Sequence, residues 1–164
     1  MPAIDHRVAL TPVPGSRNLG LVDGLAQLTF AVQGALTRIA ASHDVSVVQA
    51  RLLGILRDRE PTIKELAAFL GLDKSSVTGL VDRAEERGLV HRVPSTVDGR
   101  SVHVRITAPG RALIKRATAQ FEAEIGELVA GLSASQRKQL SEAATVIAAS
   151  DAGRRGVDIF AVRE

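Results

Sequence analysis

The sequence contains no cysteine, tryptophan or tyrosine, and aromatic residues make up only 2% of its 164 residues. The absence of cysteine excludes disulfides, thiolate catalysis, cysteine-based redox sensing and cysteine-type zinc sites. The scarcity of aromatic side chains argues against binding of single-stranded nucleic acid or RNA by base stacking. No apolar run approaches the roughly 18–20 residues of a membrane span, and the N-terminus lacks the apolar core of a secretory signal. We therefore expect a cytoplasmic protein.

Signatures of catalysis and of metal binding are also missing. The chain has no G-x-S-x-G, no P-loop and no G-x-G-x-x-G, and its carboxylates are scattered over predicted helix surfaces. The four histidines do not follow the spacing of metal ligands. We expect a protein that is not an enzyme and that carries no metal and no cofactor.

Positive charge is concentrated in one part of the chain. The net charge is only +3, but residues 91–116 hold six basic residues against a single acid, Asp98. An electrostatic footprint for a polyanion is one interpretation of this segment. A solvated surface that is basic by composition is the other, and charge alone does not separate the two.

Hydrophobic periodicity predicts a largely helical chain. Residues 1–18 contain prolines and a glycine without a clear period, and we interpret them as an arm. Helix starts are marked by the capping boxes that begin at Ser46, Thr62 and Ser133 and by a capping Asp73. Apolar residues that recur every three or four positions then predict helices at residues 19–41, 46–57, 63–70, 73–87, from 107 onward and 133–150.

Two short strands interrupt this helical pattern. Residues 89–93 and 101–106 read as strands, and the second alternates apolar Val102, Val104 and Ile106 with polar residues. The turn between them carries Asp98 and Arg100. A short helix, a glycine turn, a second helix and a hairpin form a winged helix-turn-helix. We therefore predict a mainly α fold with this lobe between long N- and C-terminal helices.

The second helix of this motif presents a polar face of short side chains with a cation at each end. Small hydroxyls allow close approach to DNA, and a glycine in an exposed helix costs about 1 kcal/mol relative to alanine, which favours a functional reason for Gly79. A solvated polar face is the alternative. The face consists of Lys74, Ser75, Ser76, Thr78, Gly79, Asp82 and Arg83.

The segments ELAAFLGLDKSSVTGLVDRAEERGLVHRV and DGRSVHVRITAPGRAL carry a resemblance to the MarR family of winged-helix transcription regulators, over about residues 20–150. The resemblance implies that residues 73–87 form the recognition helix in the major groove. It also implies that Arg100 reaches the minor groove while Asp98 helps to hold it. Members are homodimers on pseudo-palindromic operators, and most are repressors released by small phenolic or anionic ligands.

The same resemblance divides the chain into an arm (1–18), a dimerisation helix (19–45), a DNA-binding lobe (46–106), and C-terminal dimerisation helices with a tail (107–164). We expect the apolar end of the tail to lengthen the dimer interface. The expected DNA contacts are Lys74, Ser75, Ser76, Thr78, Gly79, Arg83, Arg92 and Arg100. Phe30, Arg38, His43 and Arg51 are the candidates for a ligand pocket, but an ordinary charged surface is the interpretation that the sequence favours for them.

The sequence thus predicts a homodimeric DNA-binding regulator, of repressor type, with double-stranded DNA and a small aromatic or anionic ligand as partners. An architectural DNA binder of the same fold that tolerates many sequences is one alternative. A winged helix used as a protein-interaction module is another, and the cations Lys74, Arg83 and Arg100 argue against it.

Overall fold

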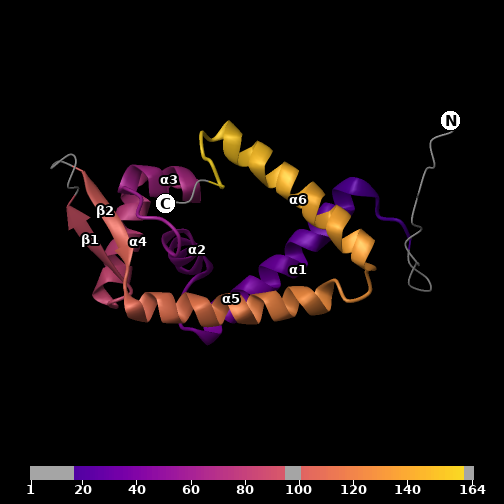
Figure 1. Ribbon diagram of the computed structural model, residues 1–164, viewed down its shortest axis with the longest axis horizontal. Helices are drawn as coiled ribbons and strands as arrows, with labels where there is room; N and C mark the ends of the chain where they lie inside the picture. The colour runs from indigo at the N-terminus through magenta and orange to yellow at the C-terminus, as the bar shows by residue number, and fades with distance from the viewer. Residues whose placement is uncertain (1–16, 95–100, 161–164) are drawn as a thin grey trace.

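The chain folds into a small lobe carried at one end of a set of long helices (Figure 1). The computed structural model describes residues 17–94 and 101–160. Its elements follow the order α1 (Gly20–Ser42), α2 (Val47–Leu56), α3 (Ile63–Leu70), α4 (Lys74–Glu86), β1 (Val90–Pro94), β2 (Val102–Ile106), α5 (Ala108–Leu128) and α6 (Ala134–Arg154). This is the mainly α winged helix-turn-helix that the sequence predicts.

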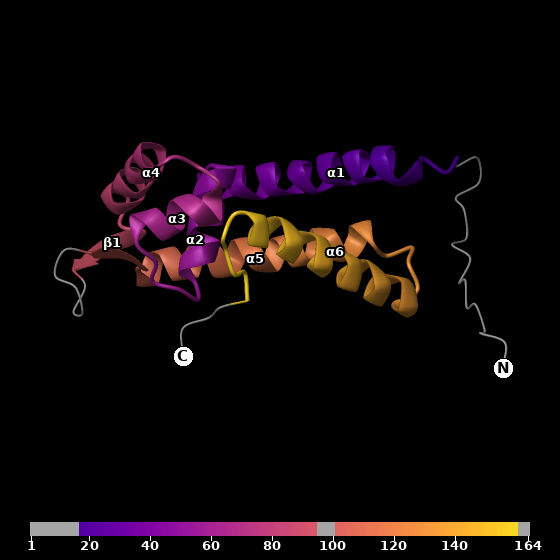
Figure 2. The same ribbon diagram turned by 90° about the horizontal axis from the view of Figure 1, so that it is seen from above.

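The long helices extend away from the lobe. In Figure 2, α1, α5 and α6 run lengthwise in one direction, while α2, α3, α4 and the hairpin gather at the opposite end. Within the described residues, no helix is long and apolar enough to cross a membrane by itself. Helices α1 and α2 are long and apolar enough only when they are taken together, and the pair is bent by 85°.

Local hydrogen bonds begin the helices where the sequence places their caps. Ser46, Thr62 and Ser133 each accept from the backbone N–H three residues on, and the side chain at that third position reaches back to the cap, so all three capping boxes are confirmed. At the start of α4 the Asp73 side chain accepts from the Ser76 N–H, and at the start of α5 the Thr107 hydroxyl accepts from the Gly110 N–H. Helix α3 ends at Gly71, whose φ of 69° lies in the left-handed region that favours glycine.

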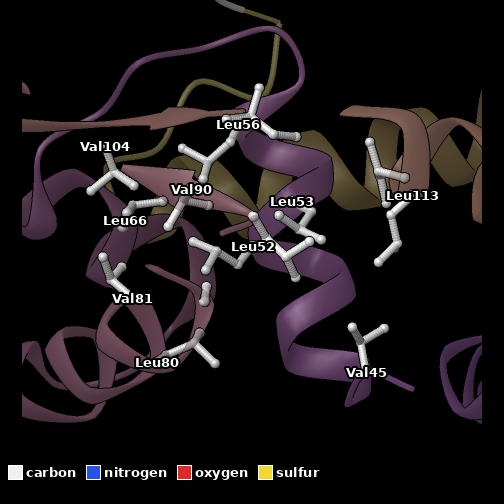
Figure 3. Close-up of a cluster of buried hydrophobic side chains, with 14 of the residues drawn as sticks. Val45, Leu52, Leu53, Leu56, Leu66, Leu80, Val81, Val90, Val104 and Leu113 are labelled. Carbon is white, nitrogen blue, oxygen red and sulfur yellow. The ribbon is translucent and has the colours of Figure 1, made fainter. Parts of the chain in front are cut away.

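One hydrophobic core joins every element of the lobe. Helix α2 lies at its centre, and side chains from α3, α4 and both strands surround it (Figure 3). Burial of a large aliphatic side chain contributes about 1.5–3 kcal/mol. The largest fully buried side chains are Leu52, Leu53, Leu56, Leu66, Val77, Val81, Val90 and Val104.

The hairpin begins one residue later than the sequence predicts. Antiparallel pairing runs from Val90 opposite Ile106 to Pro94 opposite Val102. His91 lies opposite Arg105 and His103 lies opposite Val93, so the two histidines of the hairpin do not face each other. The His103 ring instead contacts the Glu60 carbonyl at 2.7 Å and ties β2 to the loop before α3. Asp98 and Arg100 lie outside the described residues.

The junction between the hairpin and α5 is very tightly packed at Gly110. A Cβ built on this residue would lie 2.2 Å from the Leu89 carbonyl oxygen and 2.9 Å from Cγ1 of Ile106. Thr107 reinforces the same contact, because its N–H donates to the Leu89 carbonyl and its hydroxyl to the Gly88 carbonyl. The absence of a side chain at Gly110 therefore lets α5 start directly against β1.

We expect Gly110→Ala to destabilise the protein by about 1–3 kcal/mol, as overpacking of a tight contact does. Chemical denaturation gives the change in free energy of unfolding. Gly54→Ala in α2 is the matched control, because a Cβ there meets no atom within 4 Å. The control should be neutral or stabilising by up to about 1 kcal/mol, and equal effects of the two substitutions would contradict the packing argument.

Candidate nucleic-acid interface

Helix α4 has one face in the core and the opposite face in solvent. Val77, Leu80, Val81 and Ala84 are buried against α2, α3 and the hairpin. On the other side Lys74, Ser75, Ser76 and Arg83 are exposed, while Thr78 and Gly79 are half-buried. The structure thus brings the six predicted contact residues of this helix onto its outer side.

The hydroxyls on this outer face already have acceptors within the protein. Ser75 and Ser76 donate to the Asp73 carboxylate at 2.5 Å, and Thr78 donates to the Lys74 carbonyl at 2.8 Å. Hydrogen bonds from the Ser75 and Ser76 side chains and from the Ser76 backbone hold the pKa of Asp73 well below its usual range. The hydroxyls therefore fix the start of α4 and do not stand free as donors.

Two cations remain for an outside partner. Lys74 and Arg83 make no ion pair with the described part of the chain, and both are exposed. They stand nine residues apart, which is about 13 Å along the helix axis. A Cβ on Gly79 would meet only the Arg83 guanidinium, at 3.4 Å, so nothing within the described fold requires a glycine there. The absence of a side chain at Gly79 therefore leaves a shallow depression at the centre of this face.

Arg92 holds the hairpin to α4. Its guanidinium pairs with Asp82, at 2.6 Å, and with Glu85, while its backbone N–H donates to Glu85 at 2.9 Å. Partial burial lowers the pKa of Arg92, but the hydrogen bonds and charges of the two carboxylates outweigh it and raise that pKa above its ordinary value. The sequence assigned Arg92 to DNA and no role to its acidic partners.

A second tie fixes the far end of α4. Arg87 donates to the Asp44 carbonyl at 2.6 Å, and Asp44 has a positive φ of 56° in the loop between α1 and α2. The sequence gave no signal for this pair, because its members are separated by 43 positions. The C-terminal end of α4 is thereby oriented by contacts with the hairpin and with the loop between α1 and α2.

A small cavity lies where α1, α2 and α5 meet. Its volume is about 130 Å³, close to that of cavities that accept a single aromatic ring. Arg51 and Thr118 supply its polar groups, and the remaining lining is apolar: Leu36, Ile39, Ala40, Val47, Ala50, Ile114, Ala117 and Phe121. An apolar cavity with one guanidinium suits a small organic anion.

Of the four predicted pocket residues, only Arg51 reaches this cavity. Arg38 pairs with Glu124 at 2.6 Å, and the His43 ring contacts Gln120 at 2.8 Å, so both join α1 to α5. Phe30 is 67% exposed on α1. Arg51 also donates to the carbonyls of Phe69 and Leu70, at 3.3 and 3.4 Å, and so caps the end of α3.

A wider cleft of about 400 Å³ lies beside the cavity, between α5 and the end of α2. Arg57, Arg111 and Lys115 give it a basic rim. Arg111 donates to the Arg57 carbonyl at 2.9 Å and Arg57 pairs with Asp58 at 2.8 Å. The sequence did not single out this cleft, because its cations come from two elements that only folding brings together.

Comparison with known proteins agrees with this geometry. A sequence model of the MarR family matches residues 43–101, which include α2, α3, α4 and β1 and end just before β2. The homoprotocatechuate degradative operon repressor of Escherichia coli is 29% identical over 123 residues, which are 74% of this chain and 82% of that protein.

Solved structures give the same result over more of the chain. A MarR-family transcriptional regulator from Rhodococcus sp. RHA1 superposes with a TM-score of 0.69 at 28% identity, over 81% of this chain and 96% of that one. CouR of Rhodococcus jostii RHA1, solved with p-coumaroyl-CoA, gives 0.68 at 29% identity over the same shares. Residues 43–101 therefore match the MarR family, and the chain has the fold of MarR-family winged helix-turn-helix DNA-binding regulators.

Proposed function

We propose that the protein is a homodimeric transcription repressor that binds a pseudo-palindromic operator and leaves it when a small aromatic acid binds. The observation that carries this proposal is the outer face of α4, with Lys74 and Arg83 exposed about its small central Gly79. The Escherichia coli relative is an operon repressor, which supports the same direction of control.

Exposed apolar side chains on the long helices support the homodimer. Contiguous apolar surface of this kind marks an interaction site in a folded protein, and helices of identical copies bury it symmetrically. We assign residues 19–45 and 107–164, which contain these helices, to the dimerisation region. On α1 the exposed residues are Leu21, Val22, Leu25 and Phe30, and on α6 they are Leu140, Val146 and Ile147.

In the proposed complex α4 lies in the major groove. Lys74 and Arg83 bind phosphates at the two ends of the helix, and the internally bonded hydroxyls keep its start rigid. Arg100 enters the minor groove and Asp98 holds it, as the family resemblance implies. Arg92 acts through Asp82 and Glu85 by fixing the hairpin against α4.

Arg51 is the proposed link between ligand and DNA. A carboxylate in the cavity between α1, α2 and α5 competes with the carbonyls of Phe69 and Leu70 for this guanidinium. A charged acceptor forms the stronger hydrogen bond. The end of α3, just before the recognition helix, is then released from α2, and α4 loses the orientation that operator binding needs.

We expect Arg100→Ala to weaken operator binding at least about tenfold per subunit, as loss of a specific groove contact does. The slope of log affinity against log salt concentration should also become shallower by about one unit. Gel-shift titration at several salt concentrations measures both. Lys138→Ala is the control, because it removes one exposed charge from the first half of α6, and α6 starts away from the lobe (Figure 1).

Equal affinity of wild type and Arg100→Ala would contradict the role of this residue. Footprinting on the DNA upstream of the protein's own gene separates the rival functions. A repressor protects a discrete site with two-fold symmetry, and an architectural binder protects DNA without one. A protein-interaction module shows little salt-sensitive DNA affinity.

Gly79→Ala should have opposite effects on folding and on DNA binding. The added methyl meets only a flexible guanidinium, so the substitution should stabilise α4 by up to about 1 kcal/mol. Operator affinity should fall, because the methyl raises the part of the face that approaches the bases. Thermal unfolding and gel-shift titration test the two effects, and unchanged affinity would argue against close approach at this position.

Small aromatic acids should raise the melting temperature of the protein and release it from DNA. In Arg51→Met the apolar lining of the cavity stays while the guanidinium is lost. About tenfold more acid, or more, should then be needed for the same stabilisation and the same release. Thermal shift and competition gel shift with a panel of such acids measure the change. Retention of the full response in Arg51→Met would exclude the proposed link.

A further inference from the structure

The end of α6 returns to the DNA-binding lobe of its own chain. Gly156, at a φ of 69°, ends the helix, and the N–H groups of Gly156 and Val157 donate to the Gly153 and Ala152 carbonyls. This is the Schellman arrangement, which brings an apolar residue after the helix against its last turn. Ala152 and Val157 are 1% and 9% exposed. The segment after α6 is therefore packed down, although most of α6 is exposed.

Two arginines join this segment to α3. Arg155 donates to the Phe69 carbonyl at 3.5 Å, while Asp151 holds the same guanidinium at 3.0 Å. Arg59 donates to the Ile159 carbonyl at 2.7 Å, and its guanidinium lies 5.1 Å from the centre of the Phe69 ring. Both views place the end of α6 beside α3 (Figures 1 and 2). The described tail thus contacts its own chain, and a part for it in the dimer interface stays a prediction, since Phe160 is 62% exposed.

The contacted point is the end of the helix that precedes the recognition helix. Phe69 and Leu70 form the last turn of α3, Gly71 makes the turn, and α4 starts at Lys74. Carbonyls at a helix C-terminus lack partners within the helix and carry partial negative charge, so guanidinium groups stabilise them. Arg51 reaches this end from α2 and Arg155 reaches it from α6.

We propose that residues 155–160 form an intrachain latch that sets the orientation of the helix-turn-helix relative to the α5–α6 arm. Arg155 and Arg59 are then positioning residues for operator binding. Because α6 belongs to the dimer region in the function proposed above, on which this inference rests, the latch fixes the separation of the two recognition helices. It makes the protein selective for the spacing of operator half-sites.

The latch is separate from what holds the lobe together. The core of the lobe contains neither Ala152 nor Val157. Arg51 also donates to the Phe69 carbonyl, so this oxygen keeps a partner when Arg155 is removed. Variants of the latch should therefore fold. Their effect should appear as a loss of the fixed orientation of the helix-turn-helix relative to the α5–α6 arm.

Arg155→Ala and Arg154→Ala form a matched pair of adjacent charge removals. Among the residues that the structure describes, Arg154 pairs only with Asp151, at 3.6 Å, within its own helix. The first readout is amide hydrogen exchange at Gly71 and Leu72, whose N–H groups bond the Ala67 carbonyl at 2.9 and 3.1 Å. We expect exchange there to be several-fold faster in Arg155→Ala and unchanged in Arg154→Ala. Equal exchange in the two variants would overturn the latch, whether or not the protein binds an operator.

The second readout is discrimination between operators whose half-site spacing differs by one base pair. One base pair rotates a half-site by about 35°, since a turn of DNA holds 10–10.5 base pairs. Wild type and Arg154→Ala should keep their preference for the natural spacing. In Arg155→Ala the ratio of the affinities for the natural and the altered spacing should fall about tenfold. Faster exchange with full discrimination would show a purely structural contact and overturn the positioning role. A wild type without operator affinity would instead refute the proposed function.

Arg59 gives an independent check by conservative replacement. Arg59→Lys keeps a cation that can donate to the Ile159 carbonyl and lie over the Phe69 ring, whereas Arg59→Ala keeps neither contact. Spacing discrimination should fall in Arg59→Ala and recover most of its value in Arg59→Lys. Equal discrimination by the two variants would contradict a role for this side chain in the latch.

Discussion

The burial of one face of α4 in the core around α2 is the interaction on which the rest of the structure depends. Leu52 and Leu53 of α2 are completely buried, as are Val77 and Val81 of α4. Because these apolar residues repeat at helical spacing, their burial also decides which side chains face outward. Lys74 and Arg83, the proposed DNA contacts, face solvent because the opposite side of their helix is fixed in this way.

Polar contacts then refine the orientation that the core imposes. Arg92 pairs with two carboxylates of α4, and Arg87 ties the end of this helix to the loop after α1. Each exposed pair contributes modestly, by about 0–1 kcal/mol, so their main effect is on direction and not on stability. The serines of the outer face serve the same purpose, since they bind Asp73 and stiffen the start of α4.

The end of α3 connects these parts of the molecule. Its Phe69 carbonyl accepts from Arg51, which also lines the cavity, and from Arg155 at the end of α6. The cavity, the long arm and the recognition helix thus meet at one helix terminus. A helix end is suited to this role, because its unpaired carbonyls attract cations from several elements at once.

The sequence by itself determined the features that depend on near neighbours. Capping boxes, helical periods and strand alternation join residues a few positions apart, so the helices, the hairpin and the outer face of α4 could be predicted from it. The first strand was placed one residue early, because the Leu89 carbonyl serves the start of α5. Only the tertiary structure decided the partners of Arg92, the cavity at Arg51 and the return of residues 155–160 to α3. Those contacts join elements up to 100 positions apart, and no local pattern encodes such a meeting.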